Sequence, residues 1–172
     1  PVKAIELCEK PVIGAINGVA ITGGFELALA CDVLIGSTSA RFADTHARVG
    51  IMPGWGLSQK LSRAVGIYRA KELSLTGNFL SAEQACAWGL VNRVVPAEQL
   101  PEIAAAVARQ LAEGPTLAFG LTKRAMQRGW GMSLDEALEY EAYLQEVAGR
   151  SADNREGIAA FLEKRPPNFT GR

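Results

Sequence analysis

The stretch from Thr22 to Asp32, TGGFELALACD, constrains the fold more than any other part of the chain. Two glycines open a predicted helix, and Glu26 is the only charged residue in this stretch before Asp32. Every residue from 27 to 31 is apolar, and a helix that is apolar on all sides is typical of a protein interior. Glu26 is therefore predicted to be buried, where a poorly hydrated carboxylate remains available for proton transfer.

Gly23 and Gly24 allow a ligand to approach the backbone closely, because they have no side chain. The N–H groups in the first turn of a helix lack intrahelical partners and favour a negative charge. Together these features predict an oxyanion site beside a buried acid/base. Glu26 also has a simpler interpretation as a first-turn carboxylate that only stabilises the helix, and its spacing from Thr22 does not fit a capping box.

Strands and helices alternate in the first part of the chain, and helices fill the rest. Apolar runs predict strands at residues 12–16, 33–36, 40–43 and 90–95. The glycine-opened helix is predicted to end near residue 31, and residues 19–22 are expected to lead into it. Further helices are predicted at residues 57–66, 68–75, 81–89, 98–113, 116–128, 133–150 and 154–164. Residues 1–10 have the pattern of a helix tail or a linker. The order predicts an α/β core over residues 1–95 and a helical region over residues 96–172.

Composition narrows the classes of partner. The 172 residues are 48% hydrophobic and 21% charged, and eighteen basic residues balance eighteen acidic ones. This balance is typical of a globular domain and gives no electrostatic support for a nucleic-acid or membrane-surface partner. No apolar run reaches the roughly 18 residues of a membrane span. Three dispersed cysteines suggest a reducing compartment, and a cytoplasmic location is expected.

Several common catalytic motifs are missing. Residues 18–25 superficially resemble a phosphate loop, but Gly24 and Phe25 occupy the positions of its Lys and Ser/Thr. The dinucleotide-binding fingerprint is absent after Ile16, and so is the nucleophile elbow G-x-S-x-G. The single histidine has no partner histidine, so no metal site is expected.

Residues 44–56 are predicted to form a functional loop, since long loops without periodicity often carry function. His46 is a candidate acid/base, because histidine is the residue type suited to proton transfer near neutral pH, although a surface histidine is the simpler interpretation. Trp55, between two glycines, suits a ligand contact and a packing role equally well.

Residues 10–32, KPVIGAINGVAITGGFELALACD, closely resemble the signature of the enoyl-CoA hydratase/isomerase (crotonase) family. The resemblance continues through residues 53–56 (PGWG), 75–77 (LTG) and 89–91 (GLV) to 161–165 (FLEKR), and so covers nearly the whole chain. It implies a crotonase-like (ClpP/crotonase) α/β fold: stacked ββα turns followed by a helical C-terminal trimerisation region. The assembly would be a homotrimer or a hexamer of two trimers.

The resemblance also implies a lyase or isomerase that acts on enoyl-CoA thioesters, as in fatty acid metabolism. Gly23 N–H would be one of two oxyanion-hole donors that stabilise an enolate, and Glu26 would match the first of the two hydratase glutamates. Gly24 and Trp55 would contact the substrate. Besides these, Phe161 and Lys164 would help to cover and bind CoA. No cofactor is implied, because coenzyme A is part of the substrate.

The chain departs from the family pattern in two places. The second hydratase glutamate aligns with His46, which leaves open whether an imidazole replaces it functionally; Asp44 is a nearby alternative carboxylate. There are three alternatives to a hydratase: an isomerase, an enzyme that runs another crotonase-type reaction with a single acid/base, or a catalytically weak acyl-CoA-binding subunit. The family also has a substantial segment before the position of Lys10, so the chain is expected to be a C-terminal portion of a longer protein.

Overall fold

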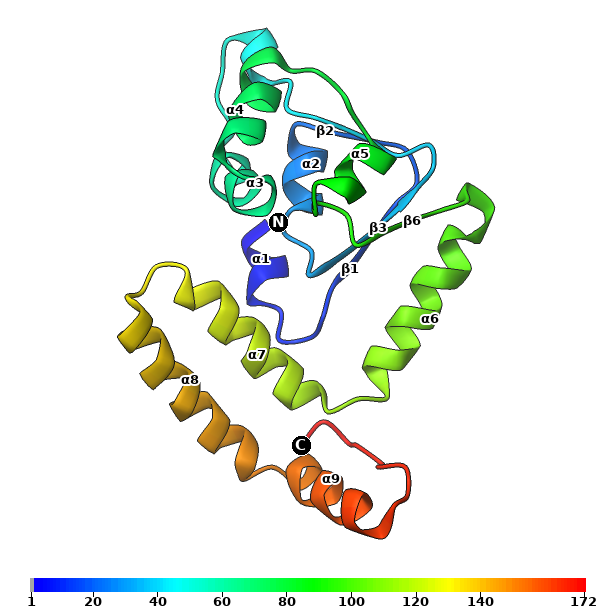
Figure 1. The fold of residues 1–172 in the computed structure, drawn as a ribbon, viewed down its shortest axis with the longest axis vertical. Coiled ribbons are helices and arrows are strands. Elements are labelled where there is room, and N and C mark those ends of the chain that lie inside the picture. Colours follow the sequence, from blue (N-terminus) through cyan, green and yellow to red (C-terminus); the bar gives the residue numbers. More distant parts are fainter. Residues whose placement is uncertain (1) are drawn as a thin grey trace. The chain divides into compact units, whose positions relative to one another are not determined.

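The computed structural model describes residues 2–172, which form two compact units. The first unit contains residues 2–7 and 12–105, and the second contains residues 8–11 and 106–172. The helices are α1 (Val2–Leu7), α2 (Gly23–Ala28), α3 (Leu57–Val65), α4 (Ile67–Thr76), α5 (Ala82–Ala87), α6 (Leu100–Ala112), α7 (Thr116–Gly129), α8 (Leu134–Gly149) and α9 (Ala152–Glu163), with 3₁₀ turns η1 (His46–Val49) and η2 (Ala97–Gln99) (Figure 1). The strands are β1 (Ile13–Ile16), β2 (Val19–Ile21), β3 (Val33–Ser37), β4 (Arg41–Ala43), β5 (Leu80–Ser81) and β6 (Arg93–Val95).

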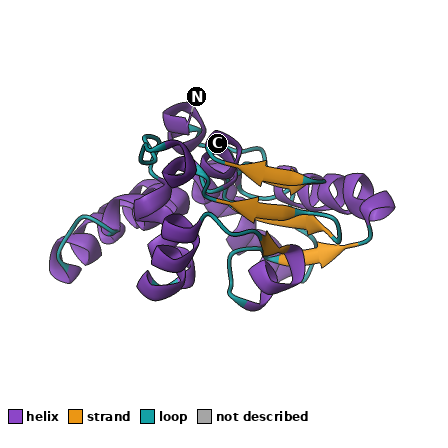
Figure 2. Cartoon of the chain, turned by 90° about the horizontal axis from the view of Figure 1, so that it is seen from above, coloured by secondary structure: helices purple, strands orange, loops and turns teal. Residues whose placement is uncertain are grey.

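Two three-stranded sheets organise the first unit. One has the order β1-β3-β6 with all strands parallel, and Figure 2 shows strands of the unit lying side by side. The other has the order β2-β4-β5, in which β2 and β4 are parallel and β5 is antiparallel. The chain twice follows the same order: a strand of the first sheet (β1, then β3), a strand of the second sheet (β2, then β4), and then a helix (α2, then α3). These successive ββα turns confirm the predicted α/β class and stacking.

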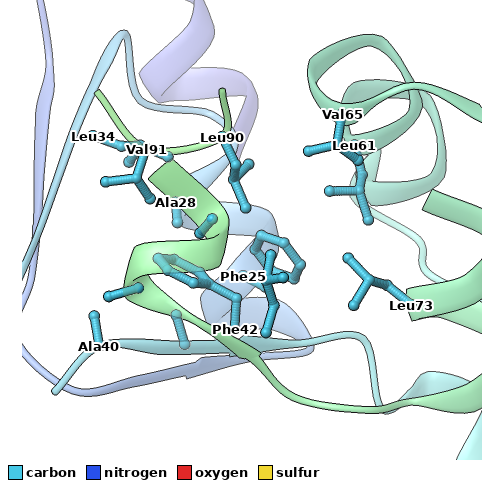
Figure 3. Close-up of a cluster of buried hydrophobic side chains, with 14 of the residues drawn as sticks. Phe25, Ala28, Leu34, Ala40, Phe42, Leu61, Val65, Leu73, Leu90 and Val91 are labelled. Atoms are coloured by element: carbon cyan, nitrogen blue, oxygen red, sulfur yellow. The ribbon is translucent and has the colours of Figure 1, made fainter. Parts of the chain in front are cut away.

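The core of the first unit lies between α2, the β2-β4-β5 sheet and the helices α3 and α4. The rings of Phe25 and Phe42 are fully buried with their centroids 5.4 Å apart, and Figure 3 shows them in one apolar cluster with Leu61 and Leu73. Burying side chains of this size contributes about 1.5–3 kcal/mol each. The core therefore anchors α2, and with it Glu26, against a rigid apolar layer.

The structure corrects several sequence-based boundaries. Residues 19–21 form strand β2 instead of a lead-in to the helix, and β5 was not predicted. The glycine-opened helix ends at Ala28, not near residue 31, because the N–H groups of Ala30 and Cys31 bond to carbonyls only three residues back. The predicted strand at 90–95 is reduced to residues 93–95.

Glycines and serines set several helix ends where the sequence predicts them. Gly66 directly follows α3 and Gly77 directly follows α4, and they adopt φ angles of 86° and 66° that disfavour other residues. Ser81 caps α5 by accepting a hydrogen bond from the Gln84 N–H.

The second unit is helical. Helices α7 and α8 lie side by side (Figure 1), and α8 starts with a capping box between Ser133 and Glu136. Residues 8–11 belong to this unit: Lys10 Nζ donates to Thr116 Oγ1 at 3.0 Å, and Glu9 pairs with Arg124. The predicted division of the family fold into domains 1–95 and 96–172 stays a prediction.

The C-terminal residues fold back on α9 and form what we call the tail clamp, residues 165–172. Asp153 accepts hydrogen bonds from the tail backbone at Thr170 and Gly171, and its own N–H donates to the Arg172 carbonyl. Glu156 accepts from the Arg165 guanidinium and the Asn168 N–H.

Of the helices in residues 2–172, none has the length and apolar character needed to cross a bilayer.

Candidate active site

Glu26 lies in the first turn of α2 and is 3% exposed, which confirms the predicted burial. Its Oε1 accepts a hydrogen bond from the Trp55 N–H at 2.6 Å and a longer one from the Leu57 N–H at 3.4 Å. Trp55 lies in the loop that precedes α3, and Leu57 is the first residue of α3. The end of the loop and the start of α3 therefore hold one carboxylate oxygen and leave Oε2 to face the other buried polar groups.

His46 and Asp44 lie at the start of the same loop, directly after β4. His46 is 8% exposed and Asp44 is 1% exposed, so His46 is not a surface histidine. His46 Nδ1 lies 2.7 Å from Asp44 Oδ1, and His46 Nε2 lies 3.8 Å from Glu26 Oε2. The structure thus brings together Glu26 and His46, two of the predicted catalytic residues, and adds Asp44 behind the imidazole.

Trp55 and Gly23 lie next to each other on the other side of Glu26. A Cβ atom added to Gly23 would lie 3.2 Å from Trp55 Cζ3, so the indole packs over the Gly23 backbone while remaining 48% exposed. Gly24 is exposed and has open space where a side chain would be. A ligand can therefore approach the backbone at Gly24, whereas the indole covers part of the backbone at Gly23. The oxyanion role of Gly23 and the substrate contacts of Gly24 and Trp55 stay predictions.

Thr22, the residue before α2, has φ 46° and ψ −118°. A β-branched residue at positive φ is a conformational outlier that costs about 1–3 kcal/mol. The Thr22 side chain makes no capping hydrogen bond to the helix, while its N–H donates to the Ala43 carbonyl at 3.2 Å. The turn joins the start of α2 to the end of β4, and so sets the spacing between Glu26 and the Asp44–His46 loop.

Phe161 and Lys164 belong to the second unit. Phe161 is 82% exposed, and Lys164 ends α9 in a left-handed conformation with φ 55°. Both side chains are available for an external contact. Their role in binding CoA stays a prediction.

The sequence reasoning missed two parts of this arrangement. It did not find the Trp55 and Leu57 N–H groups as partners of Glu26, because backbone donors leave no side-chain signal. It named Asp44 only as an alternative carboxylate, although the D-x-H spacing after a strand was a usable signal for a carboxylate–imidazole contact. In residues 2–172 no group of three or more His, Cys, Asp or Glu side chains is placed to hold a metal ion.

The fold and the site together define a class: a stacked ββα core with a buried glutamate at a glycine-opened helix. The model of the enoyl-CoA hydratase/isomerase family matches residues 2–172. The chain therefore belongs to the enoyl-CoA hydratase/isomerase family.

Its relatives share sequence over nearly the whole chain. It is 45% identical over 171 residues to 1,2-epoxyphenylacetyl-CoA isomerase of Escherichia coli and 42% identical over 171 residues to crotonyl-CoA hydratase of Syntrophomonas wolfei. These matches cover 99% of the chain and 65% of each relative, so the chain spans somewhat less than two thirds of their length. The crystal structure of enoyl-CoA hydratase from Bacillus anthracis matches with a TM-score of 0.95 and 40% identity, and covers 99% of this chain and 66% of that one.

Proposed function

We propose that the protein acts on enoyl-CoA thioesters as an enoyl-CoA hydratase-type enzyme. The observation that carries this proposal is the pairing of Glu26 Oε2 with His46 Nε2, 3.8 Å apart, beside the glycine-opened start of α2. Family membership and relatives named as hydratases support it.

In the proposed reaction, Gly23 N–H donates to the thioester oxygen. The oxygen of water bonds to the β-carbon, the π electrons of the C=C bond move toward the thioester to form an enolate, and a proton then adds to the α-carbon. A single oxyanion donor is worth roughly 3–4 kcal/mol in related chemistry. Glu26 Oε2 and His46 Nε2 are the two groups that take the proton from water and deliver one to carbon.

Other parts of the proposal concern the protein as a whole. Phe161 and Lys164 would bind CoA, often across a subunit boundary in a homotrimer or hexamer. No metal or redox cofactor is required, because the thioester itself makes the α-proton acidic. A cytoplasmic location remains part of the proposal.

An isomerase is the second candidate. It is favoured by the replacement of one carboxylate by His46, because a 1,3 proton shift needs one group to take a proton and return it, and does not need a pair of carboxylates to hold water. A relative with 45% identity is named an isomerase of another acyl-CoA thioester, 1,2-epoxyphenylacetyl-CoA, so it supports isomerisation in general and not the 1,3 proton shift in particular. A catalytically weak acyl-CoA-binding subunit is the third.

Kinetics with crotonyl-CoA test the proposal, with Glu26→Gln as the main variant. We expect turnover to fall by about 10²–10⁴-fold, the usual contribution of a positioned acid/base, while calorimetry shows CoA binding unchanged. Glu139→Gln, on the exposed surface of α8, is the matched control and should keep the wild-type rate.

Product analysis separates the candidates. Formation of 3-hydroxybutyryl-CoA supports the hydratase, and a shifted double bond in a longer enoyl-CoA supports the isomerase. Unchanged turnover in Glu26→Gln would rule out the assigned chemistry, and binding without turnover in the wild type would leave the binding subunit.

A further inference from the structure

We propose that Asp44 is a positioning residue that holds His46 as the Nδ1–H tautomer and so turns the Nε2 lone pair toward the space between Nε2 and Glu26 Oε2. The effect of Asp44 on turnover rests on the proposed function, but its effect on the tautomer of His46 does not.

The geometry of the contact sets the direction of the hydrogen bond. Asp44 Oδ1 lies 2.7 Å from His46 Nδ1, a distance typical of a charge-assisted hydrogen bond. An ionised carboxylate can only accept, so Nδ1 must be the donor. In the neutral ring Nε2 is then the acceptor, and it is the nitrogen nearer Glu26.

Asp44 also restrains the ring. Its Oδ1 accepts from the backbone N–H of His46 at 3.2 Å as well as from Nδ1. One oxygen thus holds two donors of the same residue, which limits rotation of the imidazole. Because Asp44 is 1% exposed, water does not compete for this contact.

The other oxygen of Asp44 argues against a purely structural role. Oδ2 is buried and has no hydrogen-bond partner among the described residues. A buried carboxylate with an unpaired oxygen is costly, so it contributes little to folding. Its bonded oxygen contacts only His46 among the described residues, so the carboxylate is arranged to act through the imidazole.

The gap between His46 and Glu26 leaves room for one atom of a ligand. At 3.8 Å, Nε2 and Oε2 are too far apart for a direct hydrogen bond, but close enough for both to contact one small polar atom of a ligand or water. Asp44 sets which nitrogen of His46 faces that atom.

Nitrogen-15 NMR of the imidazole tests the tautomer directly. His46 is the only histidine in the 172 residues, and its signals can be verified by their loss in His46→Gln. At a pH where the ring is neutral, we expect a protonated Nδ1 and an unprotonated Nε2 in the wild type. In Asp44→Asn we expect the Nδ1–H population to fall, and kcat on crotonyl-CoA to fall on the order of 10³-fold with little change in KM.

Asp135→Asn, at an exposed position of α8, is the control and should change neither readout. A neutral wild-type ring with Nε2–H overturns the proposal, and so does an Asp44→Asn variant that keeps both the tautomer and kcat. If Asp44→Asn does not fold, as judged by circular dichroism, the wild-type tautomer decides alone. If the wild type turns over no enoyl-CoA, the proposed function fails while the NMR result still decides the role of Asp44.

Discussion

Asp44 in the first unit and Asp153 in the second are both buried, at 1% and 3% exposure, but their carboxylates are used differently. Both oxygens of Asp153 accept hydrogen bonds: Oδ1 from the N–H and hydroxyl of Thr170, and Oδ2 from the Gly171 N–H. Asp44 uses only Oδ1, toward His46, and its Oδ2 has no partner among the described residues.

The difference separates a structural carboxylate from one arranged for chemistry. Satisfying every lone pair makes a buried charge tolerable, and the bonds of Asp153 tie the tail clamp to α9. The hydrogen bonds of Asp44 restrain only His46, two residues further along the chain. No contact among the described residues offsets the free-energy cost of burying its unpaired Oδ2. The incompletely bonded carboxylate is the one that lies beside the candidate acid/base pair.

Asparagine at position 153 should have the larger effect on stability. Since both carboxylate oxygens accept from N–H or O–H donors, the amide NH₂ of asparagine must face a donor in either orientation. We expect Asp153→Asn to lower the free energy of unfolding by about 1–3 kcal/mol, as for other buried donors left unsatisfied. Urea unfolding measures this loss, and faster amide exchange at Thr170 and Gly171 should accompany it. Unchanged exchange would show that Asp153 does not hold the tail.

Asp44→Asn should change the free energy of unfolding less than Asp153→Asn does. Either end of the asparagine amide can bond to the imidazole: its oxygen accepts from the Nδ1–H tautomer, and its NH₂ donates to the Nε2–H tautomer, so the contact is kept while the tautomer is no longer fixed. Loss of a buried charge offsets the weaker hydrogen bond, so the unfolding free energy should change by under about 1 kcal/mol in either direction. The same urea experiment compares the two asparagine variants. A loss as large as that of Asp153→Asn would make Asp44 a structural residue.

Thr22→Gly tests whether the first unit stores strain next to the site. Glycine adopts the φ of 46° without steric cost, but it also has more conformational entropy to lose on folding. We expect a net gain of about 0.5 kcal/mol in the free energy of unfolding, measured by thermal or urea unfolding. Thr38→Gly is the control: Thr38 is exposed and is not among the non-glycine residues with positive φ, so the same change should destabilise. Equal effects of both changes would mean that Thr22 is not strained.

The local sequence pattern predicted the presence of most helices and strands in both units better than it predicted their first and last residues. The glycine-opened helix, the burial of Glu26 and the helices of residues 98–164 follow from apolar periodicity and turn residues. Strand β5 has only two residues, and its pairing with β4 depends on contacts that no local pattern encodes. The pairing of Glu26 with the Trp55 N–H links residues 29 positions apart through a backbone group, so the sequence could predict the carboxylate but not its partners.

The smallest effect should come from Glu156 at the edge of the tail clamp. Hydrogen bonds from the Arg165 guanidinium and then from the Asn168 N–H lower the pKa of Glu156 from 4.5 to about 2. A carboxyl group whose pKa is lower in the folded state stabilises that state above its unfolded pKa, and this contribution is lost as the pH falls through the folded pKa. The contacts of Glu156 with the tail should therefore be intact above about pH 5 and weaken between pH 4.5 and 2. The Asn168 amide shift in NMR should follow this titration, and Glu156→Gln should abolish it. An Asn168 shift that is flat over this range in the wild type would show that the outer part of the clamp does not depend on this carboxylate, and would leave Asp153 as the residue that holds the tail.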